Sequence, residues 1–151
     1  MIFIVDAILI IAVVAADQLV KSWIVMNIGL GATHQVIPGI LSLTNIRNDG
    51  AAWSILEGKT FFFYLITIVA VGVLGYFLYR TRGQWLYQIS LSFMLAGALG
   101  NFIDRIRLKY VVDMFQLDFI NFPIFNVADF ALTIGVILLF IAILREDHLE
   151  G

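Results

Sequence analysis

The sequence predicts an all-α membrane protein, a four-transmembrane-helix bundle with a small extended, β-like insert and a short interfacial helix. Two observations support this fold class. Of the 151 residues, 62% are apolar and 13% are charged, and a soluble domain of this size could not hide so much apolar surface in one core. Four stretches are also close to the roughly 20 apolar residues that cross a bilayer as a helix: residues 3–26, 61–79, 85–103 and 124–144.

Composition also limits the organisation and the chemistry. No linker, repeat or low-complexity tract divides the chain, so we expect a single membrane domain over residues 1–151. A formal net charge of −2 with scattered basic residues argues against a nucleic-acid partner. The absence of cysteine excludes a disulfide framework, a thiolate metal site and a cysteine nucleophile. His34 and His148 are far apart in the sequence, so we expect no metal site, and no motif calls for a cofactor.

The first predicted helix, residues 3–26, carries charge within its apolar run. It lacks a basic segment at its start, where Asp6 stands instead, and its apolar run continues past Asp17, so we expect an uncleaved membrane helix and not a secretory signal. Asp17 and Lys21 lie one helical turn apart on the same face. They should face the bundle, where an ion pair that locks helix packing is at least as well supported as a catalytic role.

Between the first two helices, residues 27–59 form a polar insert. Pro38-Gly39 and Asn48-Asp49-Gly50 are typical of turns. Residues 41–44 alternate apolar and polar side chains, which predicts a short extended ribbon near the membrane surface. Residues 51–56 predict an interfacial segment with Trp53 at headgroup depth.

The second half of the chain supplies two further helices and their connections. Residues 80–84 form a tight turn, and small residues at 96–100 should allow close helix approach. The segment 108–123 is mixed in polarity and predicts a loop, after which Pro123 suits a helix start.

With four spans, the polar motifs gather at one face of the membrane. The ends of the first and third helices and the starts of the second and fourth lie on the same side by parity. That side receives most of the polar side chains that stand out from the apolar background: Asp17, Lys21, Asn48, Asn101, Asp104, Arg105, Asp113, Asn126 and Asp129. The other side receives a two-arginine turn and the two termini. This one-sided distribution indicates a functional site at one surface of the membrane.

Spacing gives these residues several possible roles. Asn101, Asp104 and Arg105 share a helix face, where a charge pair closing the bundle and a functional role are about equally supported. Asn126 and Asp129 fall on the first turn of the fourth helix, where a carboxylate also stabilises the helix dipole.

Asp113 lies in the loop before the fourth predicted helix, and this loop can bring it to the same side of the membrane. Two carboxylates in a partly dry site tend to share a proton, so one can activate water while the other protonates a carbonyl oxygen. Spacing alone does not establish that Asp113 and Asp129 converge.

Five ordered motifs together resemble a known family. They run from the first helix to the fourth: Asp17-Gln18-x-x-Lys21, Arg47-Asn48-Asp49-Gly50-Ala51-Ala52-Trp53-Ser54, Gly100-Asn101-x-x-Asp104-Arg105, Val111-Val112-Asp113 and Phe125-Asn126-Val127-Ala128-Asp129. This order is similar to that of bacterial lipoprotein signal peptidase, or signal peptidase II.

The resemblance implies an aspartyl endopeptidase of the bacterial inner membrane. It implies cleavage of prolipoprotein signal peptides just before a diacylglyceryl-modified cysteine, without a cofactor, by a monomer in contact with membrane lipids. The catalytic pair falls on Asp113 and Asp129. Other motif positions would shape the site or bind substrate: Asn48, Asn101, Asp104, Arg105, Asn126 and Ala128. Asp17 and Lys21 would be structural.

The resemblance also implies an extracytoplasmic insert, a site near the outer face and cytoplasmic termini. The distribution of basic residues favours the opposite orientation, because six Lys or Arg lie on the side of the motifs and three on the other. We expect the orientation of the family, since charges in an active site can distort this count. The alternative function is a small proton-coupled transporter, because carboxylates within a membrane also serve as proton relays.

Overall fold

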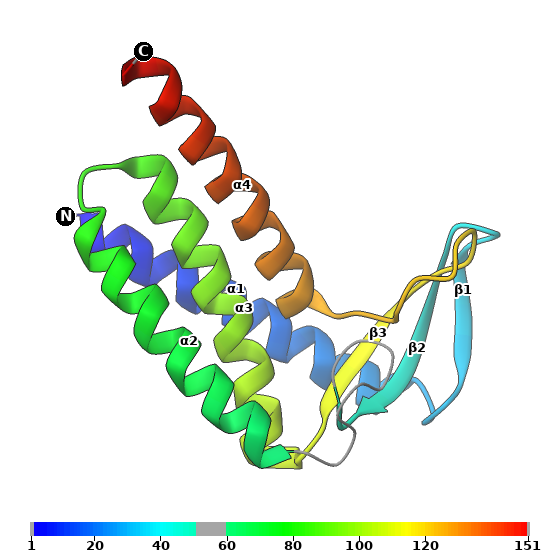
Figure 1. Ribbon diagram of the computed structural model, residues 1–151. Helices are drawn as coiled ribbons and strands as arrows, with labels where there is room; N and C mark the ends of the chain where they lie inside the picture. Colours follow the sequence, from blue (N-terminus) through cyan, green and yellow to red (C-terminus); the bar gives the residue numbers. More distant parts are fainter. Residues whose placement is uncertain (1, 51–59, 151) are drawn as a thin grey trace.

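The computed structural model describes residues 2–50 and 60–150, which form four helices and one small sheet. The helices are α1 (Ile2–Asn27), α2 (Thr60–Arg80), α3 (Trp85–Leu108) and α4 (Val127–Glu150). α3 packs against each of the other three (Figure 1). The predicted interfacial segment with Trp53 lies outside the described residues.

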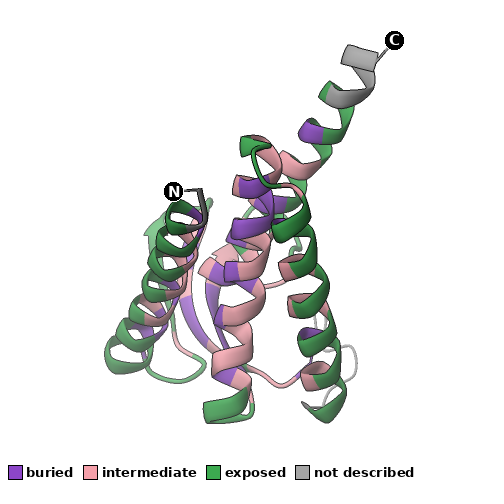
Figure 2. Cartoon of the chain, turned by 90° about the vertical axis from the view of Figure 1, so that its left-hand side faces the viewer, coloured by how far each residue is buried: buried purple, intermediate pink, exposed green. Residues whose placement is uncertain are grey.

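The helices expose the apolar side chains that the sequence predicts to contact lipid. Exposed residues cover the outward sides of the helices, whereas buried residues gather between them (Figure 2). Three helices in the described parts of the chain, Phe61–Arg80, Trp85–Leu108 and Val127–Arg145, are long and apolar enough to cross a membrane. The chain therefore has the composition and helix lengths of a multi-pass membrane protein.

Glycines allow α3 and α4 to pack closely, as the small residues in the sequence predict. A Cβ atom at Gly97 would collide with the backbone carbonyl oxygen of Ala128. At Gly100 it would lie 2.8 Å from a carboxylate oxygen of Asp17. Larger side chains at these positions would push α3 away from the start of α4, where the polar motifs lie.

The three strands form an antiparallel sheet beside the site end of the bundle. β1 (Thr33–Ile37), β2 (Leu41–Asn48) and β3 (Val111–Leu117) are arranged in the order β1-β2-β3. The ribbon predicted in the insert is therefore present, but the loop predicted over 108–123 is wrong for residues 111–117. The β-branched pair Val111-Val112 enters the sheet because β2 offers it a hydrogen-bonding edge, with Val112 opposite Arg47.

Two helix boundaries also differ from the prediction. α3 continues five residues beyond 103 and ends at Leu108, where Lys109 takes a left-handed conformation (φ 73°) and its N–H reaches the carbonyl of Arg105. α4 begins at Val127 and not at 124, because the preceding Phe125 pairs its backbone with Phe115 of β3. Asn126 therefore precedes α4 and does not lie on its first turn.

A small apolar core fixes the sheet to the bundle. Ile24 of α1 and Ile28 just after it pack with Val112 and Met114 of β3, and all four are buried. Since neighbouring residues on a strand point to opposite faces, this contact holds Val112 and Met114 toward α1 and leaves Asp113 on the other face. Packing of β3 thereby aims Asp113 toward the start of α4.

Candidate active site

A cavity of about 570 Å³ is bounded by the sheet, α3, the start of α4 and residues 122–125. Its polar side chains come from Asn48, Asn101, Arg105, Asp113, Asp129 and Thr133. Most of the remaining lining is apolar and comes from β3, α4 and residues 122–125. One wall is therefore suited to polar backbone groups and the rest to apolar chains.

Asp113 and Asp129 line this cavity and share a hydrogen-bonding partner. The side-chain amide of Asn126 donates to Oδ1 of Asp113 at 2.7 Å, while its carbonyl oxygen accepts the backbone N–H of Asp129 at 2.9 Å. The backbone N–H of Asn126 donates in return to Oδ2 of Asp129 at 3.2 Å. The structure thus brings together the two carboxylates whose convergence the sequence could not establish.

The contact between Asn126 and Asp129 is also the N-cap of α4. The Asn126 side chain accepts the N–H of the third helical residue, Asp129, whose side chain in turn accepts the backbone N–H of Asn126, which is the reciprocal arrangement of a capping box. The predicted interaction of Asp129 with the helix start is therefore present, and it serves to orient the carboxylate. Asp129 therefore both stabilises the start of α4 and lines the cavity.

Each of the other two carboxylate oxygens also accepts an amide donor. Asn48 Nδ2 donates to Oδ2 of Asp113 at 2.8 Å, and Asn101 Nδ2 donates to Oδ1 of Asp129 at 2.7 Å. The four oxygens of the pair are therefore held by donors from β2, α3 and the N-cap of α4. This support fixes both carboxylates before any substrate binds.

Burial, and after it the negative charge of Asp129, raises the pKa of Asp113 to about 6. Hydrogen bonds from Asn48 and Asn126 and the charge of Lys21 act against this rise. A carboxyl group with a pKa near neutrality can exchange a proton with water or substrate at physiological pH.

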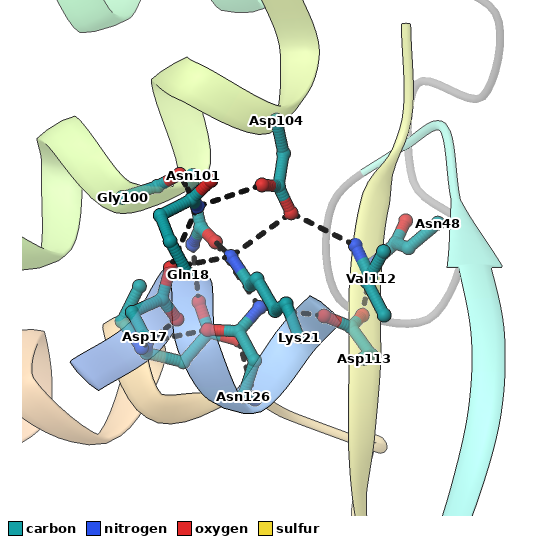
Figure 3. Close-up of polar contacts among 12 residues, drawn as sticks. Asp17, Gln18, Lys21, Asn48, Gly100, Asn101, Asp104, Val112, Asp113 and Asn126 are labelled. Atoms are coloured by element: carbon teal, nitrogen blue, oxygen red, sulfur yellow. Dashed lines mark hydrogen bonds and ion pairs between the residues drawn. The ribbon is translucent and has the colours of Figure 1, made fainter. Parts of the chain in front are cut away.

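Behind the pair lies a buried ionic cluster of Asp17, Lys21 and Asp104 (Figure 3). Lys21 Nζ lies 2.9 Å from Asp17 and 3.0 Å from Asp104. The predicted ion pair between Asp17 and Lys21 is therefore confirmed, whereas the charge partner of Asp104 is Lys21 and not the neighbouring Arg105. Gln18, which the sequence analysis quoted only within a motif, donates to Asp104 at 2.8 Å.

The ionic cluster orients backbone groups on both sides of the site. Asp17 accepts the N–H of Ala128 at 2.9 Å, and Asp104 accepts the N–H of Val112 at 3.1 Å. Ala128 is fully buried against Gly100 and does not line the cavity. Asp17 thus holds the first turn of α4, and Asp104 holds the start of β3, one residue before Asp113.

Lys21 also fixes the orientation of Asn101. Its ammonium group donates to Oδ1 of Asn101 at 3.0 Å, and Asn126 Nδ2 donates to the same oxygen at 3.1 Å. Since Lys21 is a donor only, the Nδ2 group of Asn101 is turned toward Asp129.

Arg105 projects into the cavity from α3. Its Nη2 donates to the carbonyl of Gly50 at 3.2 Å, and its guanidinium lies 4.7 Å from the ring centroid of Phe63. Because a guanidinium carries five N–H donors, this anchoring leaves donors for carbonyl oxygens of a bound chain. In the described parts of the chain, no three His, Cys, Asp or Glu side chains are grouped as a metal site requires.

Comparison with known proteins decides the family. The family model described as signal peptidase (SPase) II matches residues 9–145. The chain belongs to the signal peptidase II family. It is therefore an aspartic protease of this family.

Similar proteins cover nearly the whole chain. Over 143 residues it is 61% identical to a lipoprotein signal peptidase of Lactiplantibacillus plantarum, which covers 95% of this chain and 96% of that protein. The corresponding protein of Latilactobacillus sakei is 65% identical over 136 residues, 89% of this chain and 90% of that protein. A bacterial membrane enzyme solved by the in meso method at 2.3 Å resolution shares 41% identity, with a TM-score of 0.90 over 97% of this chain and 92% of the other.

Proposed function

We propose that this protein is an intramembrane aspartyl endopeptidase that removes signal peptides from bacterial prolipoproteins, just before the diacylglyceryl-modified cysteine. The observation that carries the proposal is the bridging of Asp113 and Asp129 by Asn126 in one cavity. The relatives named lipoprotein signal peptidase support the substrate class. This favours the peptidase over the proton-coupled transporter that the sequence left open.

In this proposal Asp113 and Asp129 are the catalytic residues. One of them, ionised, takes a proton from a water molecule as its oxygen attacks the scissile carbonyl carbon. The other, neutral, donates its proton to the carbonyl oxygen, which gives a neutral tetrahedral diol. The C–N bond then breaks as a proton passes to the amide nitrogen, and both products leave with the pair again holding a single proton.

The remaining site residues position this pair and the substrate. Asn126 and Asn101 orient the two carboxylates, and Asn48 stabilises the ionised form of Asp113. Arg105 binds carbonyl oxygens of the extended substrate, and Asp104 and Ala128 shape the site through the starts of β3 and α4. Asp17 and Lys21 form the structural ion pair beneath them.

In the proposed membrane arrangement α1 also crosses the membrane, which gives four spans together with α2, α3 and α4. α1 is 26 residues long and exposes Ile4, Val5, Ile8 and Ile11 along its outer side. We place the site near the outer face of the inner membrane, both termini in the cytoplasm, and the signal helix of the substrate in lipid beside the apolar cavity wall. The protein acts as a monomer without a cofactor.

The catalytic roles are tested with Asp113→Asn and Asp129→Asn. Each should lower cleavage of a lipidated precursor by roughly 10²- to 10⁴-fold or more, because each removes a group that transfers a proton. Asp118→Asn, which changes a carboxylate just after β3 and outside the cavity lining, is the matched control and should cleave normally. Full processing by both site variants would contradict the assignment. The same precursor without its diacylglyceryl group tests the substrate class, and equal cleavage would overturn that part.

The orientation is tested at the turn between α2 and α3. The chain has no cysteine, so Arg82→Cys gives a single labelling site. A membrane-impermeant maleimide should fail to label it in intact cells and should label it after permeabilisation. Labelling from outside would reverse the proposed orientation.

A further inference from the structure

We infer that Phe63, in the first turn of α2, is a positioning residue for Arg105. Its aromatic ring holds the guanidinium in place, so that the N–H groups are directed at the carbonyl oxygens of a bound peptide. Among the described residues, the cavity lining includes none of α2, so the part of this helix in the site is indirect. The inference rests on the proposed function, in which Arg105 binds the substrate backbone.

The contact between the two side chains is a cation–π contact. The guanidinium carbon of Arg105 lies over the ring of Phe63, 4.7 Å from its centroid. At this distance the negative face of an aromatic ring attracts a cation. The attraction acts on the charge of the guanidinium and leaves its N–H groups available. The ring can therefore hold Arg105 without using the donors that the substrate needs.

A hydrogen bond restrains the guanidinium from a second element. Nη2 of Arg105 donates to the carbonyl oxygen of Gly50 at 3.2 Å, and Gly50 follows β2, whereas Phe63 belongs to α2. A long arginine side chain loses rotamer freedom when it binds a ligand, and holding it beforehand reduces this loss. The two contacts together thus prepare Arg105 for substrate.

The neighbouring Tyr64 ties the start of α2 to the turn of α3 that carries Arg105 (Figure 1). Its hydroxyl donates to the carbonyl oxygen of Arg105 at 2.7 Å and accepts a hydrogen bond from Lys109 Nζ at 3.3 Å. Its ring packs edge-on against Phe102, with centroids 6.1 Å apart. Because Tyr64 is fixed in this way, the adjacent Phe63 is kept against the guanidinium.

The surroundings of Phe63 distinguish it from the lipid-facing side chains of α2. Phe61, Phe62 and Leu65 are exposed, whereas Phe63 is half-buried and contacts a charged group of α3. A side chain that only fills space between helices can be leucine or phenylalanine, because both bury apolar area. Attraction of a cation requires an aromatic ring. Replacement by leucine therefore separates the two roles.

The inference is tested first by the kinetics of Phe63→Leu with a lipidated precursor. kcat/KM should fall roughly 3- to 10-fold, mainly through a higher KM, because the contact helps Arg105 to bind substrate. Phe63→Tyr retains the ring and should cleave like the wild type. Phe61→Leu makes the same change at a side chain that is 79% exposed and is the matched control. Wild-type kinetics in Phe63→Leu, or an equal loss in Phe63→Tyr, would overturn the inference.

A double-mutant cycle with Arg105→Gln separates positioning from general support of the fold. Glutamine keeps a polar side chain but removes the cation. If Phe63 acts through Arg105, Phe63→Leu should change kcat/KM by less than about twofold in the Arg105→Gln protein. Single-turnover assays with excess enzyme keep slow variants measurable. An equal loss in both backgrounds would assign Phe63 to packing alone and would refute its positioning role.

The contact is also measured without substrate, by nuclear magnetic resonance of protein in detergent micelles with labelled arginine. Side-chain protons of Arg105, assigned by their loss in Arg105→Gln, should be shifted upfield by the ring of Phe63. The shift should persist in Phe63→Tyr and disappear in Phe63→Leu, and a signal that does not move in Phe63→Leu would overturn the inference. If the wild type does not cleave lipidated precursor, the proposed function fails. If it cleaves and Phe63→Leu cleaves equally well, only this inference fails.

Discussion

The two ends of the bundle both bury carboxylates between α1 and α3, but they give those carboxylates different partners. At one end, Asp17 and Asp104 share the ammonium group of Lys21. At the other end, Asp6 accepts hydrogen bonds from the neutral side chains of Gln88 at 3.1 Å and Ser92 at 3.5 Å. Both groups connect the same two helices and both are buried.

The difference lies in what surrounds each cluster. The ionic cluster continues through Asn101 and Asn126 to two further carboxylates at a cavity. The cluster at Asp6 consists of side chains from α1 and α3 and does not contribute to the lining of that cavity. A buried carboxylate alone therefore does not indicate a site. A functional site is indicated when carboxylates from several elements meet at an open cavity and are held by amide donors of fixed orientation.

The largest effect that would sharpen this comparison is expected at Lys21. Lys21→Met leaves two buried carboxylates without their cation, and breaking a buried pair in this way typically costs about 3–5 kcal/mol. The free energy of unfolding in detergent, measured by denaturant titration, should fall by this amount, and cleavage should be lost with it. Lys21→Arg keeps the charge and should lose less. A stability within about 1 kcal/mol of the wild type would show that the ion pairs are dispensable.

A smaller effect is expected from Asn48 and concerns pH. The hydrogen bond from Asn48 favours the ionised form of Asp113 and so opposes the burial and the Asp129 charge that together raise the pKa of Asp113 to about 6. In Asn48→Ala this pKa should rise, because the ionised form loses a donor. The inflection in kcat/KM that titration of Asp113 produces near pH 6 should therefore move to higher pH. An inflection that stays in place, or moves to lower pH, would contradict the assigned contact.

The smallest effect is expected at the opposite end of the bundle. Asp6→Asn retains the size of the side chain and an acceptor for Gln88 and Ser92, so the change in unfolding free energy should be within about 1 kcal/mol. Cleavage rate and its pH profile should match those of the wild type. A loss of cleavage at normal stability would mean that the two clusters are functionally connected, and the comparison would fail.

Much of the helical part of the fold followed from local sequence. The apolar runs that predicted four helices are long enough to satisfy their own backbone hydrogen bonds within each segment, so no distant partner is needed. Parity then placed the polar motifs at one end, and the motif order gave the family. Asn101, Asp104 and Arg105 were predicted to share one helix face, and α3 does carry all three.

The strand β3 and the true start of α4 could not be predicted in this way. Asp113 lies 65 positions from its hydrogen-bonding partner Asn48. Strand pairing over such a distance depends on contacts that no local sequence pattern records. Asn126 carries the same ambiguity, since an Asn fits a first turn or an N-cap, and only the pairing of Phe125 with Phe115 selects the N-cap.

By itself, therefore, the sequence determined the membrane class, the four helices, the polar end of the bundle and the family, because hydrophobicity and helical spacing act over short distances along the chain. Tertiary structure decided which carboxylates meet. The sheet carries Asp113 to the N-cap of α4, and the buried Lys21 turns Asn101 toward Asp129. These contacts join segments that are remote in the sequence, and packing of α1 against β3 and of α3 against α4 is the physical cause that brings them together.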